Sequence, residues 1–439
     1  MSLLPKIVPA LVGLALLAAP MRPARAGLDE YLKKDDPAFA WSLIETDPSD
    51  AGTVYLFKLT SQNWQGIPWV HHLQVYEPAQ VLYRDAMLLF ITGGSTDNMK
   101  SEDRVLGFKL ANLCGARVAV LPQVPNQPLL GDKKEDELIA ETFIRYLETK
   151  DENWPLLFPM VKSAVKAMDA VQAWSKGAGK PVPTRFVVSG ASKRGWTTWL
   201  TGASDPRVVA IAPMVIDTLN MKAQKTHAIE VWGKFSEQID DYTSRGLTDK
   251  FDDPDGKHLW KMVDPYSYLS RLTLPKLLIN GLNDRYWTLD ALNIYWDDLK
   301  GPKSVVYLPN AGHNLAVNGD YATNGLGAFF RANISKRAWP ALTWKHDNDG
   351  GALRLTIAST PIPKSAKLWV AQSATRDFRD STWSASDMTV AGNTAKGEVA
   401  RPSKGYIALV GDVEYELDGI PYHLSTQVRQ TGATSEGGK

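Results

Sequence analysis

A strand, a tight turn and a helix in the middle of the chain constrain its fold more than any other feature. The apolar run 184–189 leads directly into Gly190-Ala191-Ser192-Lys193-Arg194-Gly195, and helix-like sequence follows. Small residues before the serine allow a sharp turn that lifts its hydroxyl to the top of a parallel sheet. The pattern therefore predicts a nucleophile elbow with Ser192 at its tip. It differs from the commoner Gly-x-Ser-x-Gly pattern because Arg194 occupies the position of the second glycine.

An acid and a histidine follow the predicted nucleophile in the order that an α/β-hydrolase requires. Residues 274–281 and 304–309 have the composition of two short strands, and Asp284 and His313 come just after them. Because ligands bind at the carboxyl ends of parallel strands, we expect both side chains to lie beside the serine. Histidine can take the serine proton and return it to the leaving group, while the carboxylate orients the imidazole.

Alternatives to this triad remain open at the level of sequence. Asp217 follows the strand-like run 208–215 and is a rival for the acid. His227 and His258 fall in a long insertion and could line the inner surface of that insertion. The histidines show no metal-ligand spacing, and we expect neither a metal ion nor a cofactor.

Two backbone amides are the expected oxyanion hole. One belongs to Lys193, the residue after the nucleophile. The other belongs to Gly94, in the Gly-Gly turn after the apolar run 86–92. Trp287 is a candidate for the substrate pocket. The Arg194 side chain is either a substrate-binding group, able to hold a carboxylate, or the partner of a structural acid.

The pattern of apolar runs predicts an α/β-hydrolase fold with a mostly parallel sheet over residues 27–338. The stretch 217–272 is too long for a simple crossover and is predicted to form a helical cap. Residues 339–430 change to short alternating runs between turn signals, which predicts a β-sandwich of immunoglobulin or fibronectin type. The Gly/Ser/Thr-rich tail 431–439 is expected to be disordered.

Composition and the first residues limit the function classes. The chain has 439 residues and a single cysteine. Its net charge is only +1, so nothing favours nucleic acid as a partner. Residues 1–26 have the features of a signal peptide, with Lys6, an apolar run and a cleavage site after Ala26. The run is too short for stable membrane insertion. We expect a periplasmic or secreted protein of undetermined oligomeric state.

Three segments resemble the PhoPQ-activated pathogenicity-related protein family: residues 189–199, 279–284 and 309–313. The resemblance implies a secreted α/β-hydrolase-like protein that is linked in some bacteria to envelope stress and antimicrobial-peptide resistance. It does not supply a substrate. The Ser-x-Arg arrangement is also similar to that of glucuronoyl esterases, which makes a sugar-acid ester worth testing.

Two functions remain in competition. The first is a serine hydrolase, an esterase or a peptidase, that cleaves its substrate through an acyl-enzyme on Ser192. The second is a hydrolase-like binding or signalling protein with little catalysis. The presence of Ser192, Asp284 and His313 favours the first, and the altered elbow motif favours the second.

Overall fold

The computed structural model describes residues 27–96, 104–349 and 351–433. The predicted signal peptide, residues 1–26, lies outside the described residues. So do residues 434–439 of the predicted disordered tail. The start of that tail was placed too early, because Thr431 and Gly432 belong to a strand that is paired with β16.

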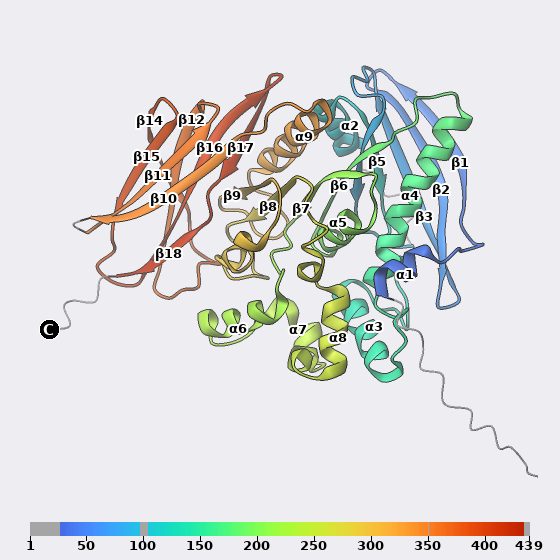
Figure 1. Cartoon of the computed structure of the whole chain (residues 1–439), viewed down its shortest axis with the longest axis horizontal. Coiled ribbons are helices and arrows are strands. Elements are labelled where there is room, and N and C mark those ends of the chain that lie inside the picture. The colour runs from blue at the N-terminus through green and yellow to red at the C-terminus, as the bar shows by residue number, and fades with distance from the viewer. Residues whose placement is uncertain (1–26, 97–103, 350, 434–439) are drawn as a thin grey trace, which may run out of the picture.

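A mixed α/β architecture surrounds one large sheet of 14 strands (Figure 1). Its central part runs in the order β1-β2-β3-β5-β4-β6-β7-β8-β9. The strands from β5 to β9 in this order are parallel, and β1 to β3 are antiparallel. This confirms the predicted mixed α/β class with a largely parallel sheet. The strands are β1 (Ala40–Ser49), β2 (Gly52–Trp64), β3 (Ile67–Pro78), β4 (Ala86–Ile91), β5 (Arg117–Leu121), β6 (Arg185–Ala191), β7 (Val208–Met214), β8 (Lys276–Gly281) and β9 (Lys303–Leu308).

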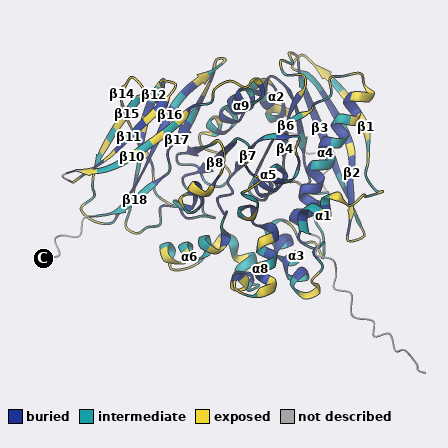
Figure 2. Cartoon of the chain, in the orientation of Figure 1, coloured by how far each residue is buried: buried dark blue, intermediate teal, exposed yellow. Residues whose placement is uncertain are grey.

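The parallel strands are almost continuously apolar because helices cover both of their faces (Figure 2). In β4, Met87 and Leu89 belong to one buried cluster and Ala86 and Leu88 to another, as alternate strand residues must. The first cluster includes helices α4 (Leu157–Gly177) and α5 (Lys193–Ser204), and the second includes α2 (Arg104–Cys114) and α9 (Gly319–Ser335).

A layer of helices lies below the sheet in Figure 1, at the end where the parallel strands point. Most of it comes from the predicted insertion 217–272. Helix α3, which precedes the elbow by more than forty residues of chain, packs against α7 and α8 in the same layer. We call this layer the cap. It consists of α3 (Glu135–Thr149), α6 (Met221–Trp232), η1 (Glu237–Ile239), α7 (Asp240–Thr243), η2 (Leu247–Phe251), α8 (Pro254–Val263) and η3 (Pro265–Tyr268).

The C-terminal strands form two antiparallel arrays, and one of them continues the central sheet. Strands β17, β16, β12 and β13 extend the sheet beyond β9, through the pair Ser425 and Val305. Strands β10, β11, β15 and β14 form a separate sheet of four. The bounds are β10 (Ala341–Asp349), β11 (Ala352–Thr360), β12 (Ser365–Ser373), β13 (Ser384–Asp387), β14 (Thr389–Ala391), β15 (Thr394–Ala400), β16 (Tyr406–Leu417), β17 (Ile420–Ser425) and β18 (Arg429–Gly432).

This arrangement differs from the expected separate sandwich at residues 339–430. The physical reason is that the outer edge of β9 has unpaired backbone groups, which β17 satisfies. Side chains of both arrays, among them Ile357 and Leu409, still share one buried cluster. The immunoglobulin or fibronectin type stays a prediction, as do the domain bounds. No helix of the described residues is long and apolar enough to cross a membrane.

Candidate active site

Ser192 lies at the sharp turn between β6 and α5, with φ 59° and ψ −126°. A positive φ is strained for a residue with a side chain, and such strain is concentrated at functional sites. The flanking glycines allow the turn because the neighbouring backbone is very close. A Cβ on Gly190 would lie 2.8 Å from the Ile91 carbonyl oxygen, and one on Gly195 would lie 2.8 Å from that of Met214. Gly195 thus provides the close helix-to-strand contact that Arg194 cannot.

Arg194 is buried and forms a structural ion pair. Its two terminal nitrogens donate to the two Glu135 carboxylate oxygens, each at 2.7 Å, and its Nε donates to the Val124 carbonyl. Burial raises the pKa of Glu135, but Arg194 and Lys193 outweigh it and hold that pKa well below the usual range. The geometry therefore favours the structural alternative for Arg194 over contact with substrate.

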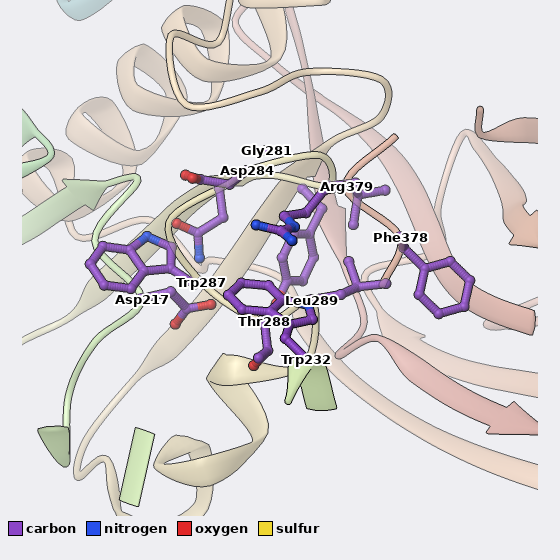
Figure 3. A pocket seen from close by; sticks show the side chains of 12 residues that line it. Asp217, Trp232, Gly281, Asp284, Trp287, Thr288, Leu289, Phe378 and Arg379 are labelled. Carbon is purple, nitrogen blue, oxygen red and sulfur yellow. The ribbon is translucent and has the colours of Figure 1, made fainter. Parts of the chain in front are cut away.

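His313 and Asp284 are joined by a hydrogen bond of 2.8 Å from imidazole Nδ1 to carboxylate Oδ2. The second Asp284 oxygen accepts the backbone N–H of Tyr286 at 2.9 Å, which fixes the carboxylate. The rival Asp217 is bonded instead to the Tyr295 hydroxyl. Burial raises the pKa of Asp217 to about 7. Figure 3 shows both carboxylates in one small pocket, and only Asp284 is bonded to the histidine.

The other imidazole nitrogen of His313, Nε2, is buried and has no hydrogen-bond partner among the described residues. The ring is stacked on Tyr286, with 4.1 Å between centroids and 30° between planes. Tyr286 also lines the cavity that contains Ser192. No hydrogen bond between His313 and Ser192 is formed among the described residues in this state. Such contacts often tighten only when substrate binds.

The expected oxyanion donors come directly after two neighbouring strands, β6 and β4. Lys193 is the first residue of α5, so its backbone N–H has no partner within the helix. Gly94, with φ +118°, follows β4, which pairs directly with β6. The Gly94 carbonyl accepts from the Gln127 side chain at 3.1 Å, which anchors the turn. The Lys193 side chain pairs with Glu135 at 2.8 Å and Asp136 at 3.2 Å.

A cavity that is partly open to solvent lies between Ser192 and the cap. Trp287 lines it, as expected for a pocket residue, and so does Lys193. His313 and Gly94 are not among its lining residues. The cap contributes most of the wall, and the lining consists of Asp136, Ser192, Lys193, Trp196, Ile216, Thr218, Met221, Gln224, Lys225, Ala228, Phe235, Ile239, Tyr242, Thr248, Phe251, Trp260, Tyr286, Trp287 and Thr288.

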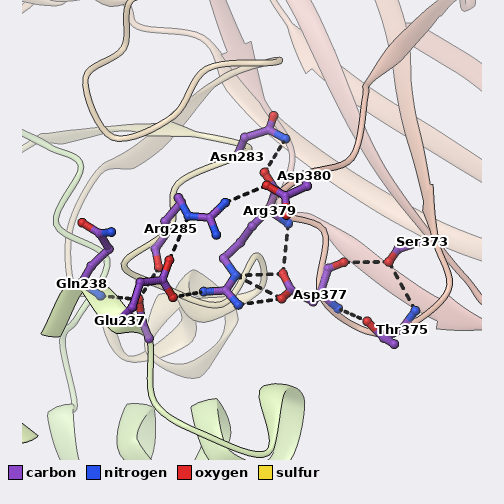
Figure 4. Close-up of polar contacts among 10 residues, drawn as sticks. Glu237, Gln238, Asn283, Arg285, Ser373, Thr375, Asp377, Arg379 and Asp380 are labelled. Atoms are coloured by element: carbon purple, nitrogen blue, oxygen red, sulfur yellow. Dashed lines mark hydrogen bonds and ion pairs between the residues drawn. The ribbon is translucent and has the colours of Figure 1, made fainter. Parts of the chain in front are cut away.

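The loop that carries Asp284 is braced by a C-terminal loop. The Asn283 amide donates to the carbonyl oxygens of Phe378, Arg379 and Ser381 at 3.4, 3.2 and 2.7 Å. Arg285, two residues further, donates to Asp380 at 2.7 Å (Figure 4). Residues far apart in sequence thus fix the position of the acid.

Sequence reasoning missed three contributors to this site. Glu135 and Asp136 begin helix α3 and pair with the two cationic side chains that follow Ser192. Tyr286 stacks on the histidine. The only local signal was the position of Tyr286, two residues beyond the acid. In the ranges that the structure describes, no group of three or more His, Cys, Asp or Glu side chains could hold a metal ion.

The fold and the site define a mixed α/β protein with a serine at a strained strand-to-helix turn and a His-Asp pair at the same sheet edge. The family model of the PhoPQ-activated pathogenicity-related proteins matches residues 28–379. Autocrine proliferation repressor protein A of Dictyostelium discoideum is 33% identical over 426 residues, covering 88% of this chain and 85% of that protein. The chain therefore belongs to the PhoPQ-activated pathogenicity-related protein family.

Among solved structures, acetyl xylan esterase 1 from Thermoanaerobacterium sp. JW/SL YS485 matches with a TM-score of 0.47 and 19% identity, covering 68% of this chain and 92% of that one. An acetyl xylan esterase from Paenibacillus sp. R4 matches with a TM-score of 0.49 and 13% identity, covering 70% of this chain and 92% of the other.

Proposed function

We propose that this protein is a serine hydrolase that cleaves an ester or amide bond through an acyl-enzyme on Ser192. The observation that carries the proposal is the His313–Asp284 hydrogen bond, which leaves imidazole Nε2 without a partner among the described residues. The His313 ring is stacked on Tyr286, which lines the same cavity as Ser192, a serine held at positive φ. A neutral imidazole with Nδ1–H bonded to a carboxylate presents Nε2 as a proton acceptor.

In the proposed reaction, Ser192 Oγ attacks the substrate carbonyl while His313 Nε2 takes its proton. Asp284 keeps the imidazole in the required tautomer and stabilises the imidazolium. The backbone N–H groups of Lys193 and Gly94 hold the oxyanion. His313 then gives the proton to the leaving group, and a water molecule, activated by the same histidine, releases the acyl group from the serine.

Labelling with a fluorophosphonate probe tests this proposal. We expect the wild-type protein to be labelled and Ser192→Ala to remain unlabelled, because the probe reacts only with an activated serine. Ser204→Ala is the matched control. It is the same substitution on the same helix, and the Ser204 hydroxyl has no hydrogen-bond partner among the described residues. Equal labelling of wild type and Ser192→Ala, or none of folded wild type, would contradict the proposal.

The proposed setting is the periplasm or the extracellular medium, after removal of residues 1–26, with a role in envelope stress or antimicrobial-peptide resistance. Its support is the leader-like composition of those residues and the family membership.

A second candidate function is a secreted signal with little catalysis. The name of the Dictyostelium relative, a proliferation repressor, favours it. A signalling role predicts that Ser192→Ala keeps full biological activity in a proliferation assay, whereas the hydrolase proposal predicts its loss.

A further inference from the structure

The cavity above Ser192 is apolar on most of its surface. Helix α6 contributes Met221 and Ala228, and the following segment contributes Phe235 and Ile239. On the opposite side the Phe251 and Trp260 rings are stacked, with 4.6 Å between centroids and 19° between planes, and form a flat aromatic wall. Burying an apolar group here would stabilise a complex by about 25 cal/mol per Å² of apolar surface.

The charged side chains that line this cavity are all paired among the described residues. Asp136 pairs with Lys193. Lys225 donates to the Thr248 carbonyl at 2.6 Å and lies 3.6 Å from Asp249. Arg194, which does not line the cavity, is occupied by Glu135. A substrate carboxylate, such as that of a free sugar acid, would find no unpaired cation on this wall.

Three buried polar groups on the same wall have no partner among the described residues: the indole N–H groups of Trp260 and Trp287 and the hydroxyl of Thr288. Buried polar groups in folded proteins nearly always have a hydrogen-bond partner. The indole N–H groups of Trp69, Trp199, Trp369 and Trp383, which do not line this cavity, also have no partner among the described residues, so these atoms do not define the ligand.

We infer that the cavity binds a bulky, uncharged, apolar group of the substrate, an aromatic ring or a long alkyl chain. This inference rests on the proposed serine chemistry at Ser192 and adds the substrate class to it. An acetyl group would leave most of the cavity unfilled, and the hydroxyl groups of a uronate ester would lose their hydration against its apolar wall.

A series of p-nitrophenyl esters from acetate to decanoate, with cinnamate and a methyl glucuronate ester, tests the inference. We expect kcat/KM to rise at least tenfold from acetate to octanoate or cinnamate, since each buried methylene contributes about 0.8 kcal/mol. A second series, acetates of alcohols of increasing size, tells whether the acyl side or the alcohol side occupies the cavity. Selectivity for large apolar groups in either series supports the inference.

Two variants on α6 localise the effect. Ala228→Phe places a ring in the cavity, and Ala223→Phe places the same ring in a different recess, beside Thr226 and Ile294. Ala228→Phe should lower kcat/KM for the large esters at least tenfold more than for the smallest ester of the same series. Ala223→Phe should change neither.

The outcomes separate the inference from the proposed function. Absence of fluorophosphonate labelling refutes the serine chemistry itself. Labelling together with a preference for acetate or glucuronate overturns the apolar substrate class and leaves the serine chemistry standing. Equal effects of Ala228→Phe and Ala223→Phe on kcat/KM also overturn the apolar substrate class.

A second inference comes from Glu152, a carboxylate whose side chain is only 6% exposed. One of its oxygens accepts the backbone N–H of Gly27 at 2.7 Å, and the other lies 2.8 Å from His258 Nε2 on α8. Burial of a carboxylate is costly unless a cation pairs with it. Gly27 is the residue that directly follows the predicted cleavage site.

We propose that removal of residues 1–26 gives Glu152 a cationic partner in addition to His258. Hydrolysis of the Ala26–Gly27 amide adds the water oxygen to the Ala26 carboxylate and leaves the Gly27 nitrogen as an α-ammonium group. This ammonium stays beside Glu152, so that processing ties α1 (Gly27–Lys33) to the cap helix α8 through one carboxylate.

Sequencing of the N-terminus of the exported protein is the first test, and Gly27 is the expected first residue. The second test compares Glu152→Gln in a chain that starts at Gly27 and in one with an additional alanine before it. We expect Tm to fall by a few degrees more in the first, because only there does the Gly27 ammonium lose its carboxylate partner. A different first residue, or equal falls in Tm, would overturn the proposal.

Discussion

Asp284 and Asp217 lie in one pocket but differ in what each carboxylate contacts (Figure 3). Asp284 accepts from an imidazole and a backbone amide, and Asp217 accepts from a tyrosine hydroxyl. We therefore expect Asp284→Asn to lower kcat about 10⁴-fold, because an amide favours the wrong imidazole tautomer. Asp217→Asn should lower it less than tenfold. Steady-state kinetics of both variants on one ester checks this, and the reverse order would assign the acid to Asp217.

Asp217 also makes stability depend on pH. Its folded pKa of about 7 lies above the ordinary value of 3.8, because burial disfavours the charged form. Below about pH 4 the carboxyl is protonated in both states and costs no folding stability. The free energy of unfolding then falls as the pH rises from about 4 through about 7. Asp217→Asn removes the ionising group, so its Tm should match wild type at about pH 4 and exceed it by roughly 5 °C at pH 8.5. Thermal unfolding at both pH values measures this, and an equal Tm difference at the two would refute it.

At the scale of elements, four side chains connect the cap to the loops around the acid. Glu237 of η1 accepts from Arg285 at 2.9 Å and from Arg379 at 3.0 Å (Figure 4). The Arg379 guanidinium also lies 4.2 Å from the ring centroid of Trp232, at the end of α6. We call this group the cap bridge: Glu237, Arg285, Arg379 and Trp232. It joins the cap to the C-terminal loop that braces the acid.

Breaking the cap bridge should loosen the cap without unfolding the protein. We expect Glu237→Gln to increase hydrogen exchange in α6 and η1, because the partly exposed ion pairs hold these segments only weakly. Exchange in β6 and β8 should stay unchanged. Hydrogen exchange with mass spectrometry measures both, with Glu230→Gln on the outer side of α6 as control. Unaltered exchange in the cap would show that apolar packing alone holds it.

The sequence predicted the elements that depend on local patterns. Strands β4, β6 and β8 were found because buried parallel strands are continuously apolar, and the elbow was found because only glycine fits at Gly190. Sequence failed where contacts join distant segments. The pair of Glu135 with Arg194 spans 59 residues of chain, and the pair of β9 with β17 uses backbone groups that every residue possesses. Neither contact produces a residue pattern that can be recognised in a single sequence.

For the whole molecule, the C-terminal strands cover what would otherwise be an open sheet edge. The Tyr307 backbone N–H donates to Ser425 Oγ at 2.9 Å, and Trp339 packs against Phe329 and Tyr422. A chain that ends at Ala338 exposes both the edge of β9 and this apolar surface. It should aggregate, because unpaired strand edges recruit other chains. Light scattering after size exclusion tests this, with a chain ending at residue 433 as control. A monodisperse product ending at Ala338 would contradict it.

The junction of β9 with β17 also sets an order of events in folding. Val305 meets a partner, Ser425, that emerges from the ribosome 120 residues later. Contacts of such long sequence separation form slowly, because the loop-closure entropy must be overcome first. The last strand of the parallel sheet therefore stays open on one side until the segment that contains Ser425 has been synthesised.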